Sequence, residues 1–109
     1  MVRFINLTPH VITIVGGNED SKIISIPPSG EIARVSIENQ LVFNLEGIEI
    51  YRAQYGQVEG LPAPEENTVF IVSTLVRARV PERLDVASPG NLVRNDAGQP
   101  IGCRGLVIN

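Results

Sequence analysis

The sequence predicts a mainly β fold, a small antiparallel sandwich or barrel with at most one short helix. Short runs of β-branched and aliphatic residues recur at regular spacing along the chain, and Gly- and Pro-rich turn signals separate them. Several of these runs also alternate polar and apolar side chains, which is typical of strands with one buried face. Because 109 residues is the usual length of one domain, we expect a single β-rich domain over residues 1–109.

The first pattern along the chain predicts a β-hairpin. Residues 11–15 are rich in β-branched side chains and run into Gly16-Gly17-Asn18, which is typical of a strand followed by a turn. Residues 22–26 are then expected to form the returning strand. Pro27-Pro28-Ser29-Gly30 marks the next turn, because proline cannot donate to the ladder of a central strand.

Two alternating segments follow. Residues 31–38 alternate polar and apolar side chains, which predicts a strand with one buried face. Residues 48–53 repeat the alternation, and they place Arg52 on the face of Ile48 and Ile50, where a guanidinium calls for a partner. Gly56 is expected to begin a long connection.

Residues 68–73 are the most apolar strand candidate, and we expect them to lie centrally in a sheet. Residues 74–79 are expected to form one short helix. Ser73 can cap its N-terminus, and Pro81 can end it.

The end of the chain predicts a second hairpin. Residues 91–94 and 100–103 flank the segment Asn95-Asp96-Ala97-Gly98, whose glycine can adopt the positive φ of a short bulged loop. The sequence contains no linker, low-complexity tract or internal repeat, in keeping with one domain.

Composition narrows the class of protein. Hydrophobic residues make up 43% and charged residues 19% of the chain, which is typical of a globular protein and far from a disordered one. The single cysteine, Cys103, excludes an intrachain disulfide framework and a site built from several thiolates. No segment resembles a signal peptide or a membrane span, so we expect a cytoplasmic protein without a membrane partner.

Charge is distributed unevenly. The net charge of −3 argues against a protein that coats a nucleic-acid polymer, but residues 77–109 hold five arginines and only three acids. Arginine makes forked contacts with phosphate or carboxylate, so this last third is where an anionic ligand would be held. The alternative is that these arginines form ion pairs with acidic side chains.

Thr8 and His10 are the candidate catalytic residues. His10 is the only histidine, and Pro9 before it stiffens the backbone ahead of a predicted strand. An imidazole with an ordinary pKa of about 6.5 can take and return protons near neutrality. The structural alternative is that Thr8 and His10 only satisfy backbone groups at a turn.

Other site patterns are missing. One histidine and one distant cysteine give no zinc-ligand spacing, and the glycines form no phosphate-binding loop, so we expect no metal and no cofactor. Cys103 beside Arg104 could have a lowered pKa, but a small apolar residue in a strand is the interpretation we favour. The remaining groups suit a small phosphorylated ligand, because arginines neutralise phosphate, tyrosines stack on a base and a histidine moves a proton.

Five segments also carry a resemblance that covers nearly the whole chain. They are Asn6-Leu7-Thr8-Pro9-His10, Ile26-Pro27-Pro28-Ser29-Gly30 with Ala33-Arg34-Val35, Phe70-Ile71-Val72-Ser73, Ser88-Pro89-Gly90 with Val93-Arg94, and Ile101-Gly102-Cys103-Arg104-Gly105-Leu106. Together they resemble a family of small phage and prophage proteins that has no assigned chemistry. By analogy of size and origin, small phage proteins include some that trap or cleave nucleotide immune signals.

The first hypothesis is therefore a phage-derived anti-defence protein in the cytoplasm of an infected bacterium, which cleaves a cyclic dinucleotide without a metal ion. In it, His10 is the general acid or base and Thr8 positions the substrate, while Arg94, Arg104, Arg34 and Tyr51 bind the ligand. The second hypothesis is a sponge that sequesters a cyclic nucleotide or an ADP-ribose-type signal without turnover. The third is a structural or host-interaction phage protein. We expect a homo-oligomer, because subunit interfaces commonly build such pockets.

Overall fold

The computed structural model describes residues 2–16 and 23–109, and the described chain is mainly β with one short helix, as predicted. The elements, in chain order, are β1 (Arg3–Asn6), β2 (Ile12–Val15), β3 (Ile23–Ile26), β4 (Arg34–Leu45), β5 (Ile48–Glu59), β6 (Thr68–Ile71), α1 (Thr74–Ala78), β7 (Val86–Arg94) and β8 (Pro100–Ile108). No helix among these residues has the length and apolar composition needed to cross a bilayer.

The strands form two sheets. In residues 2–16 and 23–109, six strands make one mixed sheet in the order β1-β6-β7-β8-β2-β3, and β4 and β5 pair only with each other. Over the described residues the six-stranded sheet is open at β1 and β3, so the arrangement corresponds to the sandwich alternative and not to a closed barrel.

Parallel pairs distinguish this sheet from the antiparallel arrangement that the sequence predicts. β6 lies parallel to both β1 and β7, and β2 lies parallel to β8. β2 and β3 form the predicted antiparallel hairpin, as do β7 and β8. The predicted turn at Gly16-Gly17-Asn18 and residue Lys22 fall largely outside the described residues.

The short helix matches its prediction. The Ser73 side chain accepts a hydrogen bond from the Val76 backbone N–H at 3.3 Å, which satisfies one of the free donors of the first turn. Arg79 is the C-terminal cap, two residues before Pro81. Val76 is the buried residue of the helix, and it anchors α1 to the core.

The predicted C-terminal hairpin is confirmed, and both of its strands are longer than expected. The Asn95 side chain accepts hydrogen bonds from the backbone N–H groups of Ala97 and Gln99, each at 3.0 Å, so it closes the loop from within. Gly98 has a φ of 81°, the left-handed conformation that the sequence predicted for it.

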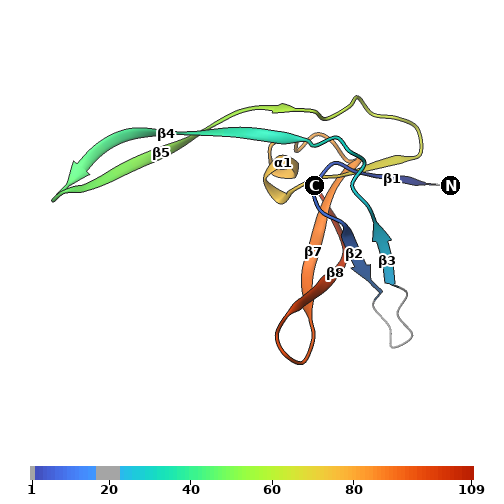
Figure 1. The fold of residues 1–109 in the computed structure, drawn as a ribbon. Helices are drawn as coiled ribbons and strands as arrows, with labels where there is room; N and C mark the ends of the chain where they lie inside the picture. The colour runs from blue at the N-terminus through green and yellow to red at the C-terminus, as the bar shows by residue number, and fades with distance from the viewer. Residues whose placement is uncertain (1, 17–22) are drawn as a thin grey trace.

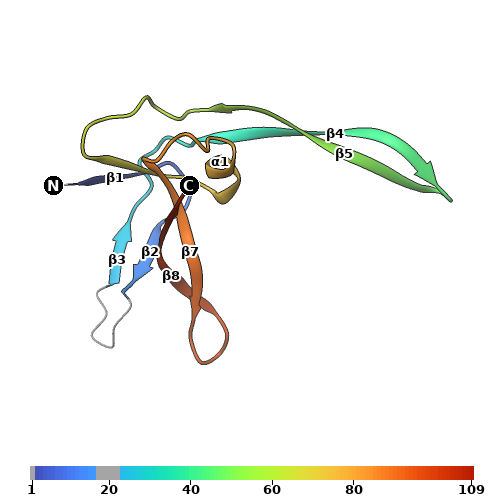
Figure 2. The same ribbon diagram turned by 180° about the vertical axis from the view of Figure 1, so that it is seen from behind.

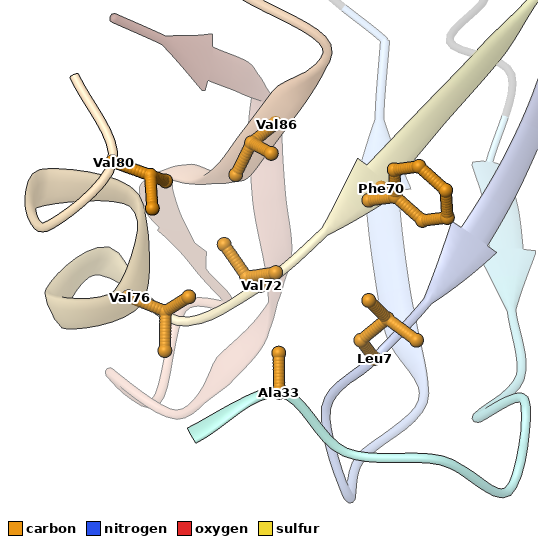
Figure 3. Packing of buried hydrophobic residues seen from close by; sticks show 7 residues of the cluster. All are labelled: Leu7, Ala33, Phe70, Val72, Val76, Val80 and Val86. Carbon is orange, nitrogen blue, oxygen red and sulfur yellow. The ribbon is translucent and has the colours of Figure 1, made fainter. Parts of the chain in front are cut away.

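The larger hydrophobic core cluster lies where the helix meets the six-stranded sheet (Figure 3). Its buried members come from the loop after β1, the start of β4, β6, α1 and the segments that flank them: Leu7, Ala33, Phe70, Val72, Val76, Val80 and Val86. The Ala33 N–H donates to the Leu7 carbonyl at 3.0 Å, which ties the start of β4 to the body of the molecule.

The β4–β5 hairpin, which we call the arm, projects away from this body (Figures 1 and 2). Burial decreases from the residue before β4 outward along the strand: Ala33 is buried, Val35 is partly buried and Ile37 is 51% exposed. The expected buried face of residues 31–38 is therefore wrong beyond Val35, because the strand leaves the core. Arg52 stands opposite Gln40, so its cross-strand neighbour is polar.

The strand β5 also runs on past Gly56, where the sequence analysis placed the beginning of a connection. Tyr55 pairs with Ile37 and Val58 with Val35, so Gly56 and Gln57 face Ser36 alone in a β-bulge. A Cβ at position 56 would lie 2.2 Å from the Ser36 Oγ. Glycine at this position thus leaves room for the Ser36 hydroxyl and does not mark the end of the strand.

Candidate functional site

The Asn6–His10 segment is a turn organised by the buried side chain of Asn6. The Asn6 amide donates to the carbonyls of His10 at 2.7 Å and Ile26 at 2.9 Å. Its Oδ1 accepts from the backbone N–H of Thr8 at 2.9 Å and from the Thr8 hydroxyl at 2.7 Å. One amide therefore joins the turn to β3 and satisfies groups that would otherwise be buried without partners.

Both predicted catalytic residues belong to this turn. The Thr8 hydroxyl is buried, bonds to Asn6 and lies 3.3 Å from the His10 N–H, so its contacts are those of the structural alternative. His10 is exposed at the entrance to β2, and its backbone N–H and carbonyl hold the turn while its side chain lies at the surface.

Arg94 and Arg104, the predicted phosphate clamps, each reach a backbone carbonyl. Arg94 Nη1 donates to the Gly98 carbonyl at 2.8 Å, across the loop of its own hairpin. Arg104 Nη1 donates to the Gly16 carbonyl at 3.2 Å, at the end of β2 opposite to the end where His10 lies.

Arg34 and Tyr51, the other predicted ligand-binding residues, lie on the arm. In the strand register, Arg34 stands opposite Glu59 at the base of the arm, and Tyr51 stands opposite Leu41 in the outer part of the arm. The Tyr51 hydroxyl donates to the Glu49 carboxylate, and this hydrogen bond raises the pKa of Tyr51. The structure thus divides the predicted site residues between the arm and the six-stranded sheet, and does not gather them at one place.

A different group of residues meets where the arm joins the body. An open hollow of about 400 Å³ is lined by the bulge of β5 and by the end of the helix: Tyr55, Gly56, Gln57, Val58, Arg79 and Val80. The Arg79 guanidinium lies over the Tyr55 ring, 5.1 Å from its centroid. The bulge leaves backbone groups of β5 outside the ladder beside this pair.

The charge of Arg79 is available for a ligand. Arg79 is exposed and forms no salt bridge within the described part of the chain, unlike Arg3 with Glu65 and Arg83 with Asp85. Cation–π contact with the Tyr55 ring holds the guanidinium at the hollow without neutralising it.

In the sequence, Arg79 was one of the five arginines of residues 77–109 and Tyr55 one of two tyrosines, and neither was singled out for a site. Their contact joins residues 24 positions apart, and no local pattern reports it. The one signal was Gly56, because a glycine inside an alternating strand suggests a bulge or a close backbone approach.

Among the residues that the structure describes, Cys103 and the acidic side chains form no second candidate site. Cys103 is buried in β8 beside an apolar hollow of about 200 Å³, and it occupies the strand position expected of a small apolar residue. In residues 2–16 and 23–109, no three His, Cys, Asp or Glu side chains gather in a group that could hold a metal ion.

Comparison with protein-family models, with curated proteins and with solved structures found no match to this chain.

Proposed function

We propose that this protein binds a small phosphorylated ligand with a planar ring, of the nucleotide-signal class, and sequesters it without turnover. The observation that carries this proposal is the hollow at the base of the arm, where the Arg79 guanidinium lies over the Tyr55 ring. Holding an immune signal of an infected bacterium in this way is the role suggested by the analogy of size and origin with small phage proteins.

The residues of the hollow suit both halves of such a ligand. A guanidinium offers forked N–H donors that match phosphate oxygens, and a tyrosine offers an aromatic face on which a base can stack. The Gln57 amide, which lines the hollow, can pair with the edge of a base. A volume of about 400 Å³ lies in the usual range of small-molecule sites.

Sequestration is better supported than cleavage. Transfer of a ribose proton needs a general base within hydrogen-bond reach of the reacting hydroxyl. The described residues that line the hollow include neither a histidine nor a carboxylate, and His10 precedes β2 in the other sheet. Binding alone requires only the contacts that the hollow offers.

Calorimetric titration with cyclic dinucleotides and cyclic ADP-ribose tests this proposal. For the ligand that binds best, we expect Arg79→Lys to weaken affinity by roughly 10-fold or more, because lysine keeps the charge but loses the fork. We expect Tyr55→Leu to weaken it by a similar factor through lost stacking. Arg52→Lys, an exposed arginine of the same arm, is the matched control and should bind normally.

Analysis of the ligand after heat denaturation separates the two activities. Intact ligand recovered from the denatured complex supports sequestration. Recovery of a cleaved product would instead show that the protein is an enzyme. Unchanged affinity in both Arg79→Lys and Tyr55→Leu would overturn the assignment of the hollow.

A further inference from the structure

We infer that Asn109 is a positioning residue for the hollow: its side chain holds the C-terminal end of α1 so that Arg79 lies over Tyr55. The consequence for ligand binding rests on the proposed function, whereas the placement of Arg79 can be measured without any ligand. The inference is carried by the hydrogen bonds that join the end of β8 to the helix and by the different surroundings of the two arginines at that helix end.

Both ends of the Asn109 side-chain amide bond to the segment that ends α1. Its Nδ2 donates to the carbonyls of Arg77 and Val80, each at 3.0 Å, and its Oδ1 accepts from Arg77 Nη1 at 3.1 Å. These two carbonyls lie on either side of Arg79 in the chain, so the amide spans the turn that carries the Arg79 side chain. In Figures 1 and 2 the end of the chain that follows β8 lies beside α1.

Arg77 extends these contacts into the six-stranded sheet. Its Nε donates to the Ser88 Oγ at 2.7 Å, and Ser88 is only 1% exposed in β7. The Arg77 guanidinium thus gives a buried hydroxyl its partner while it also bonds to Asn109. We call the hydrogen bonds among Asn109, Arg77, Val80 and Ser88 the Asn109 network. The network ties the helix end to β7 and to the end of β8 at once.

The network separates the roles of the two arginines at the helix end. Arg77 is partly buried and bonds to side chains of the protein, whereas Arg79 is exposed and lies 5.1 Å from the centroid of the Tyr55 ring. An arginine side chain has many rotamers, so the place its guanidinium occupies depends on where its backbone is held. By holding the backbone on both sides of Arg79, Asn109 sets the direction in which this guanidinium leaves the helix.

The helix needs this support because it is short. Its five residues make little more than one turn, and helices of that length are not stable by themselves in water. Val76 and Val80 anchor the helix to the core, and Ser73 caps its N-terminus. At a C-terminus the last carbonyls lack helical partners. Asn109 adds a second donor to the Arg77 and Val80 carbonyls, each of which also accepts from one backbone N–H.

Proton NMR of the ligand-free protein tests the placement. The Tyr55 ring should displace the Arg79 side-chain resonances upfield, and Tyr55→Leu should remove this displacement. We expect Asn109→Ala to remove about half of it or more, because the freed helix end lets the guanidinium leave the ring. Asn91→Ala is the matched control: Asn91 is also an exposed asparagine, but it lies in β7 outside the network, so the displacement should keep its native value.

Two further variants separate positioning from general stability. Asn109→Asp keeps the shape and the acceptor for Arg77 but loses both donors, so it should also reduce the displacement, and it keeps the test informative if Asn109→Ala fails to fold. Ile12→Val weakens the second core cluster, which includes no residue of the helix or the arm, and should leave the displacement unchanged.

Three NMR results would overturn the inference. The first is an Arg79 spectrum that Tyr55→Leu does not change, because the two side chains are then not in contact. The second is a native displacement in the Asn109 variants that fold. The third is an equal loss in Ile12→Val and Asn109→Ala, which would make the effect one of general stability.

Calorimetric titration relates the placement to binding. With the cyclic dinucleotide or cyclic ADP-ribose that the native chain binds best, Asn109→Ala should weaken affinity by about 3- to 10-fold, because the guanidinium keeps its chemistry and loses its preset position. Native affinity in Asn109→Ala would overturn the role in binding. If the native chain binds none of these probes, the proposed function fails, and the NMR spectra still decide whether Asn109 places Arg79 over Tyr55.

Discussion

At the scale of single residues, Asn6 shows how one buried amide can explain a sequence motif. It is 1% exposed, and its side chain serves both the Thr8 donors and two carbonyls on separate segments. The Asn-Leu-Thr-Pro-His run is therefore a structural turn in which Thr8 is a partner of Asn6. A catalytic role for His10 stays a prediction.

The first prediction at this scale compares two residues of the turn. Asn6→Ala should lower the free energy of unfolding by about 2–4 kcal/mol, because it leaves buried donors and acceptors unpaired. His10→Ala should change it by less than about 0.5 kcal/mol, since the His10 side chain is exposed and its backbone contacts remain. Urea denaturation at neutral pH measures both. A loss below about 1 kcal/mol for Asn6→Ala would show that water replaces these hydrogen bonds.

At the scale of elements, the arm depends on its two-residue turn. Glu46 and Gly47 have φ values of 50° and 86°, so both adopt the left-handed conformation of a type I′ turn. The Asn44 side chain supports the turn by accepting from the Gly47 N–H at 2.9 Å. Glycine adopts this conformation freely, whereas glutamate at position 46 does so at a cost.

A substitution at position 46 can therefore make this turn more stable. Glu46→Asn should stabilise the arm by about 0.5–1 kcal/mol, because asparagine is a favoured residue before glycine in this turn type. Amide hydrogen exchange should slow about two- to five-fold in residues 41–51 and stay unchanged in β7. Gly47→Ala, which forces a side chain into the same conformation, should speed exchange in the arm. Equal exchange in Glu46→Asn and the native chain would argue against strain at position 46.

At the scale of the whole molecule, Arg83 joins segments that lie far apart in the sequence. Its Nε and Nη2 donate to the Asp85 carboxylate at 2.8 and 2.9 Å, and Nη2 also donates to the Pro62 carbonyl at 3.0 Å. This contact fixes the connection between β5 and β6 against the entrance to β7. The hydrogen bond from Arg83 holds the pKa of Asp85 below its ordinary value of 3.8.

The stability of the whole molecule should depend on pH through this pair. Because the folded pKa of Asp85 is depressed, its contribution is complete above pH 3.8 and is lost as the pH falls below that value. The stability difference between the native chain and Asp85→Asn should therefore shrink from pH 6 to pH 3. Urea denaturation over this range at one protein concentration measures the difference. A constant difference would show that the carboxylate charge contributes nothing.

The sequence by itself determined the elements whose signals are local. Ser73 and Pro81 bound the helix, and Gly98 with Asn95 closes the β7–β8 hairpin, because capping and turn chemistry act over a few residues. Strand alternation likewise identified the first half of β5 and the inner part of β4.

Only the tertiary structure decided what each strand lies against. β1 pairs in parallel with β6, which lies more than 60 residues away in the sequence, and Arg79 contacts Tyr55, which lies 24 residues away. No local pattern in the sequence predicts either contact. Alternation reports which side chains share a face, but not whether a core, a second copy or water covers that face. Ile37 and Ala33 share one alternating pattern, yet Ala33 is buried and Ile37 is exposed, because the strand passes from the body into the arm between them.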